Sequence, residues 1–108
     1  MEETALAQSG NFAVIRQVAQ EIAALLNPAR IYLYSQKLNC QGDLTSFKLC
    51  VVGDFADKHK AEQSLYREID SHLPFDVLLY TIPEWEELSG CSHTFACRIQ
   101  NTGTIVYE

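Results

Sequence analysis

Cysteine, histidine and carboxylate side chains are the groups in this chain that could support catalysis or hold a metal. Cys91, His93 and Cys97 lie close together, and His93 and Cys97 would share one face if their segment is helical. A closed zinc site takes four ligands, usually in paired short spacings, and only Cys40 or Cys50 could supply a remote fourth. We therefore predict small buried side chains and a surface histidine here, with no metal bound.

Nucleophilic catalysis is a second chemistry that cysteine and histidine could support. None of the four cysteines follows a Gly-rich turn or opens a clear helix, which are the settings that lower a thiol pKa. The sequence therefore predicts no Cys–His nucleophile. Trp85 and Leu88 indicate core or interface packing and not a base-stacking platform, because the residues around them are acidic (Glu84, Glu86 and Glu87).

The elements that must position any site follow from the spacing of apolar residues. Helical spacing predicts helices over 11–26 and 57–73, each ended near a proline. Residues 81–84 form a capping box that opens a further helix, and 95–100 add one or two helical turns. Short apolar runs predict strands over 30–34, 47–52, 75–80 and 104–107. The polar stretch 35–46 is expected to connect the first two strands.

Charge and composition narrow the class of protein. The chain has 108 residues with 8 Lys+Arg against 14 Asp+Glu, a net charge of −6, which argues against a nucleic-acid partner. Residues 1–10 lack the basic and apolar parts of a signal peptide, and no apolar run approaches the ~20 residues of a membrane span. We expect a cytoplasmic protein with reduced cysteines and no membrane partner, in which a flexible segment 1–10 precedes a single domain over 11–108.

Three strands and the closing segment follow one another in a recognisable order. Residues 31–34 would lead into a turn, 47–52 form a largely apolar strand, 75–81 begin with an aspartate near the strand start, and Gly103 precedes the last apolar run. This pattern resembles the minimal nucleotidyltransferases of the DNA polymerase β superfamily, over nearly the whole chain from about Phe12. The resemblance implies an α+β fold, with a nucleotidyltransferase-like mixed sheet flanked by helices and an order close to αββαβαβ.

The resemblance also implies where a site would lie. The family carries a Gly-Ser turn followed by a basic residue, an Asp-x-Asp strand, and a third carboxylate on a later strand. In the register that fits best, these positions fall on Ser35, Gln36, Lys37, Ser46, Lys48 and Asp76. Only Asp76 keeps a carboxylate, and the turn has lost its glycine, which would let backbone N–H groups approach a phosphate.

The loss of the two strand carboxylates decides the expected chemistry. Asp-x-Asp presents both carboxylates on one face of a strand to shared Mg²⁺ ions, which activate the attacking hydroxyl and neutralise the triphosphate. Ser46 is a weak neutral ligand, and Lys48 places a positive charge where the metal would lie. We therefore expect no catalytic residues, metal or cofactor. Asp76 is expected either to pair with Lys48, which we favour, or to lie exposed at a strand start.

An alternative register would keep the Mg²⁺-dependent nucleotidyl transfer of the family. Asp43, Asp54 and Asp76 would then hold Mg²⁺, with Lys37 on the phosphates, and the protein would transfer a nucleoside monophosphate from a nucleotide triphosphate to a protein or small acceptor. This register needs about three extra residues before the apolar run, and Thr45 would still replace the second carboxylate.

The resemblance finally implies a kind of partner. Minimal nucleotidyltransferase domains are often encoded beside small helical HEPN-type proteins and form toxin–antitoxin or related complexes with them. The sequence therefore predicts a catalytically degenerate protein that acts as a protein-interaction or antitoxin-like module. Its partner would be a HEPN-type protein or a second copy of this chain, which could bind through a sheet edge or a helix face.

Overall fold

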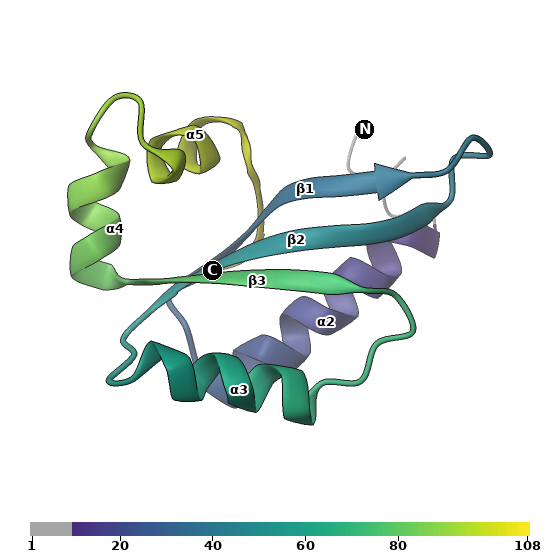
Figure 1. Ribbon diagram of the computed structural model, residues 1–108, viewed down its shortest axis with the longest axis horizontal. Coiled ribbons are helices and arrows are strands. Elements are labelled where there is room, and N and C mark those ends of the chain that lie inside the picture. Colours follow the sequence, from purple (N-terminus) through teal and green to yellow (C-terminus); the bar gives the residue numbers. More distant parts are fainter. Residues whose placement is uncertain (1–9) are drawn as a thin grey trace.

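The computed structural model describes residues 10–108 of the chain and shows an α+β fold, as predicted (Figure 1). Within these residues, four helices flank a four-stranded mixed sheet. The elements are α2 (Gly10–Leu26), β1 (Arg30–Leu38), β2 (Leu44–Gly53), α3 (Lys58–Glu68), β3 (Phe75–Thr81), α4 (Ile82–Ser89), α5 (Phe95–Thr102) and β4 (Thr104–Tyr107). The predicted flexible segment 1–10 lies outside the described residues except for Gly10, where α2 begins.

The strand order in the sheet is β3-β2-β1-β4. β1 pairs antiparallel with both β2 and β4, whereas β2 pairs parallel with β3 across the α3 crossover. β2 is therefore an inner strand with neighbours on both sides, and five consecutive residues at its end are buried. This burial explains the nearly unbroken apolar run in the sequence, which predicted a central strand.

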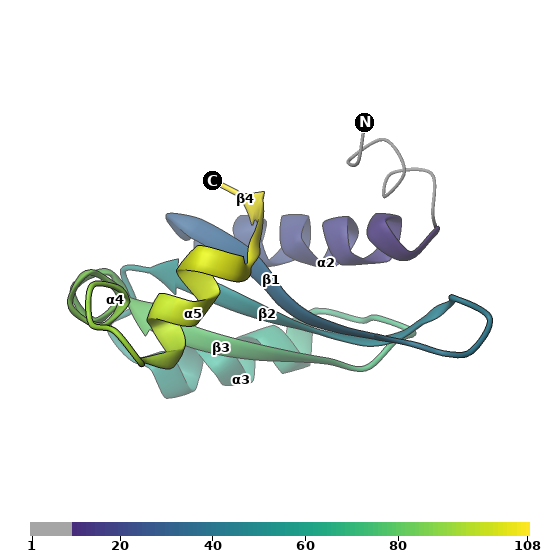
Figure 2. The same cartoon turned by 90° about the horizontal axis from the view of Figure 1, so that it is seen from above.

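Helices α2 and α3 cover one face of the sheet, which we call the closed face. Ile15, Val18 and Ile22 recur at three- and four-residue spacing along α2, and all three are buried together with Leu65 of α3. Against them pack the inward side chains of β2, Phe47, Leu49 and Val51. Figures 1 and 2 show both helices running alongside the strands. This face forms the larger of the two hydrophobic cores.

Helices α4 and α5 cover only part of the opposite face, which we call the second face. Successive strand residues point to opposite faces, so Cys50 and Val52 lie here, where Trp85 and Ile99 pack against them. Both helices lie at the end of the sheet away from the tip of the β1–β2 hairpin (Figure 1). Nearer the hairpin tip Lys48 is exposed on the same face. The helical cover therefore ends between Cys50 and Lys48.

The prediction that 35–46 is a polar connection was wrong, because β1 continues through Leu38 and β2 begins at Leu44. The true turn is short and is held by Asn39, whose Oδ1 accepts hydrogen bonds from the N–H groups of Gln41 (2.9 Å) and Asp43 (3.0 Å). Gly42 adopts a φ of 87°, which glycine tolerates without strain. Pairing with the apolar β2 extends the strand through residues whose own side chains are polar.

Two irregularities in the β1–β2 pairing change which side chains share a face. Leu33 pairs with Leu49 and Ser35 with Lys48, so Tyr34 is an extra residue in β1. A bulge of this kind bends the strand and turns neighbouring side chains toward one side. A second irregularity, at Thr45, lets Leu44 reach the closed-face core although it lies three residues before Phe47.

Helix α3 is shorter than predicted. It ends at Glu68, and Ile69 is extended, with φ −98° and ψ 122°. The prediction of a helix to residue 73 was wrong, because residues 69–74 form the connection that returns the chain to the sheet, where Phe75 pairs with Phe47.

The predicted capping box at α4 is confirmed. The N–H of Glu84 donates to Thr81 Oγ1 (3.3 Å), and the N–H of Thr81 donates to Glu84 Oε1 (2.9 Å). The Nζ of Lys58 donates to the same carboxylate at 2.9 Å and so ties the start of α3 to the start of α4. These hydrogen bonds, the one from Thr81 first, lower the pKa of Glu84.

Candidate binding surface

Three of the expected site positions come together on the second face. Ser46 and Lys48 alternate along β2, so both point to this face, and Lys48 pairs in register with Asp76 of the parallel strand β3. Both charged side chains are exposed. Within residues 10–108 no nitrogen of Lys48 lies within 4.0 Å of an Asp76 oxygen. The two residues are neighbours, but the ion pair that we favoured from the sequence is not formed.

The three expected positions on β1 are divided between the two faces. Ser35 pairs with Lys48 and Lys37 with Ser46, and residues directly opposite each other share a face of the sheet. Gln36 pairs with Phe47 and therefore points to the other side. Since all three lie within a strand, the turn that the resemblance places at Ser35 and Gln36 does not exist here.

The alternative metal ligands are not brought together. Asp43 precedes the first residue of β2 and Asp54 follows the last. The ten residues between them, at ~3.3 Å each, separate these carboxylates by roughly 30 Å. Asp76 lies opposite Lys48 and close to neither end. No group of three or more His, Cys, Asp or Glu residues that could hold a metal occurs among the described residues.

The cysteines and His93 do not come together as a metal site either, within the described residues. His93 adopts a φ of 74° in the connection before α5, so it does not share a helical face with Cys97. Cys91 is exposed, and its thiol donates to the carbonyl oxygen of Glu87 (3.2 Å). Cys50 is completely buried, and burial raises the pKa of its thiol to about 12. Cys50 is therefore a protonated core residue at neutral pH.

A pocket of about 270 Å³ opens beside Lys48. Residues of β1, β2 and α5 line it: Tyr34, Ser35, Lys48, Phe95, Arg98, Ile99 and Thr102. The bulge in β1 places Tyr34 here, where its ring meets that of Phe95 edge-on with a centroid distance of 5.3 Å. Phe95 remains 45% exposed, so the aromatic pair is a wall of the pocket and not part of the core.

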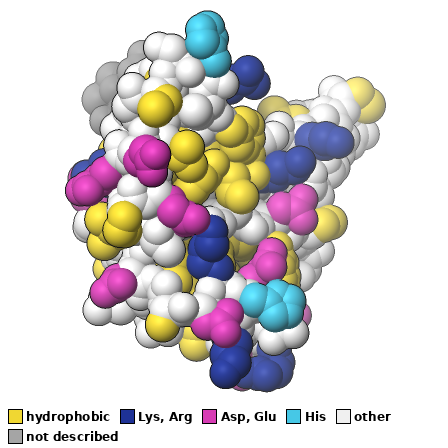
Figure 3. Space-filling view, turned by 60° about the vertical axis from the view of Figure 1, so that its left-hand side comes forward, with side chains coloured by type: hydrophobic (Ala, Val, Ile, Leu, Met, Phe, Trp, Pro, Cys, Tyr) yellow, Lys and Arg dark blue, Asp and Glu magenta, His cyan; other side chains and the backbone are white. Residues whose placement is uncertain are grey.

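The charge of this pocket is positive. Lys48 and Arg98 line it, and none of the ion pairs among the described residues involves either. Asp76 is the nearby carboxylate, next to Lys48 on β3. Burial, followed by the charges of neighbouring groups that include Asp76, raises the pKa of Tyr34, so its hydroxyl is neutral at physiological pH. Figure 3 shows the same side of the molecule, with a hollowed hydrophobic area next to Lys or Arg side chains.

Sequence reasoning missed Tyr34, Phe95 and Arg98 as members of a site. The available signal was the spacing of Phe95, Arg98 and Thr102, which puts these residues on one face of a helix, next to the face of Ala96 and Ile99 that enters the core. The spacing does not say over which strand this face lies. Only the packing of α5 against β1 places it beside Lys48.

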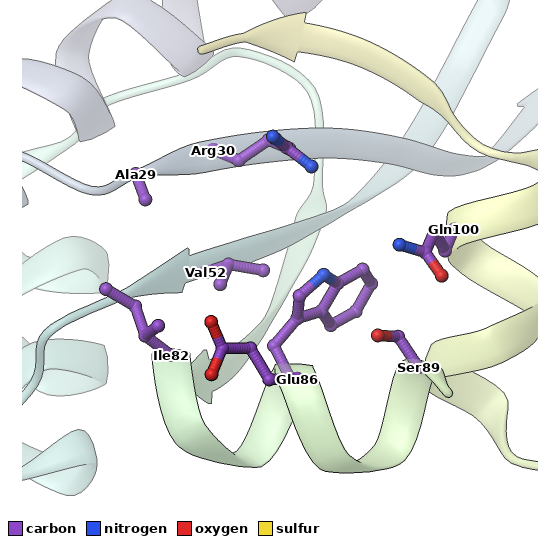
Figure 4. A pocket seen from close by; sticks show the side chains of 8 residues that line it. Ala29, Arg30, Val52, Ile82, Glu86, Ser89 and Gln100 are labelled. Carbon is purple, nitrogen blue, oxygen red and sulfur yellow. The ribbon is translucent and has the colours of Figure 1, made fainter. Parts of the chain in front are cut away.

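A second pocket, of about 390 Å³, lies at the other end of the second face (Figure 4). Arg30, Glu86, Ser89 and Gln100 line it together with apolar residues. The Nη1 of Arg30 already donates to Tyr32 Oη (3.1 Å), and its Nη2 lies 3.7 Å from Glu108. The pocket is lined by one cation, Arg30, which is already engaged, and by one carboxylate, that of Glu86. Because the two charges cancel, the pocket has no net preference for a charged ligand.

Trp85 lines this second pocket and belongs to the core. Only 6% of the residue is exposed, and its ring packs against Tyr32 and Tyr80 at centroid distances of 5.2 and 5.4 Å. The prediction that Trp85 packs in the core or at an interface agrees with this position.

Comparisons of the chain with protein-family models, with curated proteins and with solved structures found no match. Within residues 10–108, no helix has both the length and the apolar composition needed to cross a bilayer.

Proposed function

We propose that this chain is a protein-binding domain on a nucleotidyltransferase-like fold, without transfer chemistry. The observation that carries the proposal is the row Ser35, Lys48 and Asp76 across three strands of the second face. In the family that the chain resembles, the positions of Ser46, Lys48 and Asp76 would carry the three metal-binding carboxylates, and Ser35 would belong to the phosphate-binding turn. Here these positions supply one carboxylate and one ammonium group, and Ser35 lies within a strand.

Electrostatics favours the hypothesis of a non-catalytic binding domain over that of an active nucleotidyltransferase. An ammonium group about 4 Å from a cation costs about 4 kcal/mol per unit charge at an effective dielectric constant of 20, and a divalent ion doubles that cost. Asp76 alone does not compensate for it, because one exposed carboxylate binds Mg²⁺ weakly. The alternative of an active Mg²⁺-dependent nucleotidyltransferase would need Asp43 and Asp54 beside Asp76, and β2 separates those two by its whole length.

The open edge of β3 argues against binding by strand addition at that edge. The N–H of Val77 faces this edge and donates to Tyr66 Oη at 2.9 Å. The N–H of Thr81, four residues on and therefore facing the same edge, donates to Glu84. Capped N–H groups cannot pair with an incoming strand, so a partner is not expected to add a strand at this edge.

Label transfer from α-³²P-labelled ATP with Mg²⁺ tests the proposal, together with thermal unfolding with and without Mg²⁺–ATP. The expected result is no labelled product and no Mg²⁺-dependent change in melting temperature. Asp76→Ala is the informative variant, and Asp70→Ala, in the exposed connection after α3, is its matched control. Transfer or a Mg²⁺-dependent shift that is lost in Asp76→Ala and kept in Asp70→Ala would establish the enzyme and overturn the proposal.

A further inference from the structure

The uncovered part of the second face combines apolar and cationic side chains. We call it the Phe95 surface and define it by Tyr34, Lys48, Leu78, Phe95 and Arg98. Phe95 is 45% exposed, and Tyr34 and Leu78 are partly buried at the margin of the smaller core. Leu78 follows Asp76 on β3 with its side chain on the same face. These side chains extend the smaller core toward solvent, where no helix of the described chain covers them.

The charge of the Phe95 surface is opposite to that of the whole chain. The net charge of the chain is −6, yet Lys48 and Arg98 line the same pocket, with Asp76 at its margin. Among the described residues, neither cation takes part in an ion pair. A carboxylate brought to this pocket would meet two cations that are not held in an ion pair, and aromatic walls that exclude water on one side.

The geometry of the surface selects the kind of element that can lie on it. A sheet face offers side chains and no free backbone groups, so an occupant must satisfy its own backbone hydrogen bonds. A helix does so, and helices cover the closed face and the other end of the second face. An amphipathic helix that presents apolar side chains three and four residues apart would continue the layer of α4 and α5.

We propose, on the basis of the proposed function, that the Phe95 surface binds an amphipathic helix of a partner protein that carries acidic residues beside its apolar face. Its apolar side chains pack on Tyr34, Leu78 and Phe95, and a carboxylate next to them lies between Lys48 and Arg98. This helix covers the part of the second face that α4 and α5 leave open. A nucleotide is not favoured, because strand β1 replaces the phosphate-binding turn.

The test is a selection from displayed helical peptides. The probe is a library of 24-residue helices with apolar residues at three- and four-residue spacing and with Glu, Lys, Gln or Ser at random in the other positions. The full chain is the target. Selected peptides are then synthesised and their affinities measured by fluorescence anisotropy. We expect enrichment of Glu over Lys next to the apolar positions.

Two variants and a matched control locate the binding. Phe95→Ala and the double variant K48E/R98E are expected to weaken the selected peptides at least tenfold. The control is R16E/K60E, which has the same net charge but changes exposed residues of α2 and α3. It is expected to change affinity less than twofold. Thermal unfolding of each variant, compared with the unchanged chain, shows that binding is lost from a folded protein.

Several outcomes would overturn the inference. These are no enrichment of acidic peptides, equal weakening by K48E/R98E and the control, or unchanged binding to Phe95→Ala. If sedimentation shows a dimer that dissociates in the Phe95→Ala variant, the surface binds a second copy of the chain. If ATP displaces a selected peptide, the surface binds a nucleotide. The proposed function fails separately, through label transfer. A negative peptide result without transfer leaves that function standing and moves its binding surface elsewhere.

Discussion

The two faces of the sheet differ in how completely they are covered. On the closed face, Phe47, Leu49 and Val51 of β2 are all buried beneath α2 and α3. On the second face, the same strand passes from buried Val52 and Cys50 to exposed Lys48 within four residues. One strand thus contributes to a complete core on one side and to an open surface on the other. We therefore expect substitutions on the two faces to separate the stability of the fold from the proposed binding.

The largest effect is expected from the closed face. Leu49→Ala removes a completely buried side chain and should lower the free energy of unfolding by about 2–5 kcal/mol, through lost burial and the cavity left behind. Phe95→Ala, on the second face, should lower it by about 1 kcal/mol or less, because the ring is already half exposed and its main contact is one aromatic pair. Urea unfolding measures both. Equal losses would mean that the second face is as much a core as the closed face.

The next effect concerns the three positions of the second face at which the resemblance would place carboxylates. The double variant S46D/K48D should create a Mg²⁺ site with Asp76, because the three carboxylates would share one face and repel one another without a cation. At ten times the dissociation constant, Mg²⁺ should then stabilise the variant by about 1.4 kcal/mol. Thermal unfolding with and without Mg²⁺ measures this. The same double variant with Asp76→Ala is the control. A Mg²⁺ response that is equal in both would show that the three positions do not converge.

The third effect concerns the edge that joins the two faces. Tyr66→Phe removes the hydroxyl that caps the N–H of Val77 and should lower stability by about 1 kcal/mol. It should also promote self-association, since an uncapped strand edge can pair with another chain. Sedimentation velocity over a concentration series detects this. Tyr34→Phe, which removes a hydroxyl from the second face instead, should stay at the association state of the unchanged chain. If both variants behave alike, the edge is not what Tyr66 protects.

The smallest effect depends on pH. Hydrogen bonds from Thr81 and Lys58 lower the pKa of Glu84 below its usual value of 4.5, so the folded state favours the carboxylate. The resulting stability is complete above about pH 4.5 and disappears as the pH falls through the lowered pKa. Glu84→Gln should therefore cost less than about 1 kcal/mol at pH 7, because the pair is partly exposed, and less still at pH 2.5. Urea unfolding at both values tests this, with Glu87→Gln as the control. A cost that stays constant with pH would contradict it.

The amino-acid sequence by itself determined which segments become helices and strands and where most of them end. Local rules suffice for this. Apolar spacing identified α2 and the alternating strands, Asn27-Pro28 ended α2, and Thr81 with Glu84 started α4. The same alternation places Ser46 and Lys48 on one face of a strand, so the sequence already shows that these two positions, where the resemblance would place paired carboxylates, carry none.

Only the tertiary structure decided how far strand β1 extends and what lies above Lys48. Residues 35–37 are polar and carry no strand signal of their own, and β1 reaches Leu38 because β2 pairs with it. The bulge at Tyr34 and the packing of α5 on the sheet bring Phe95 and Arg98 to Lys48, fifty residues away in the chain for Arg98. Sequence periodicity reports which face of an element is apolar, but not which element that face meets. The closed core could therefore be predicted from the sequence, whereas the Phe95 surface could not.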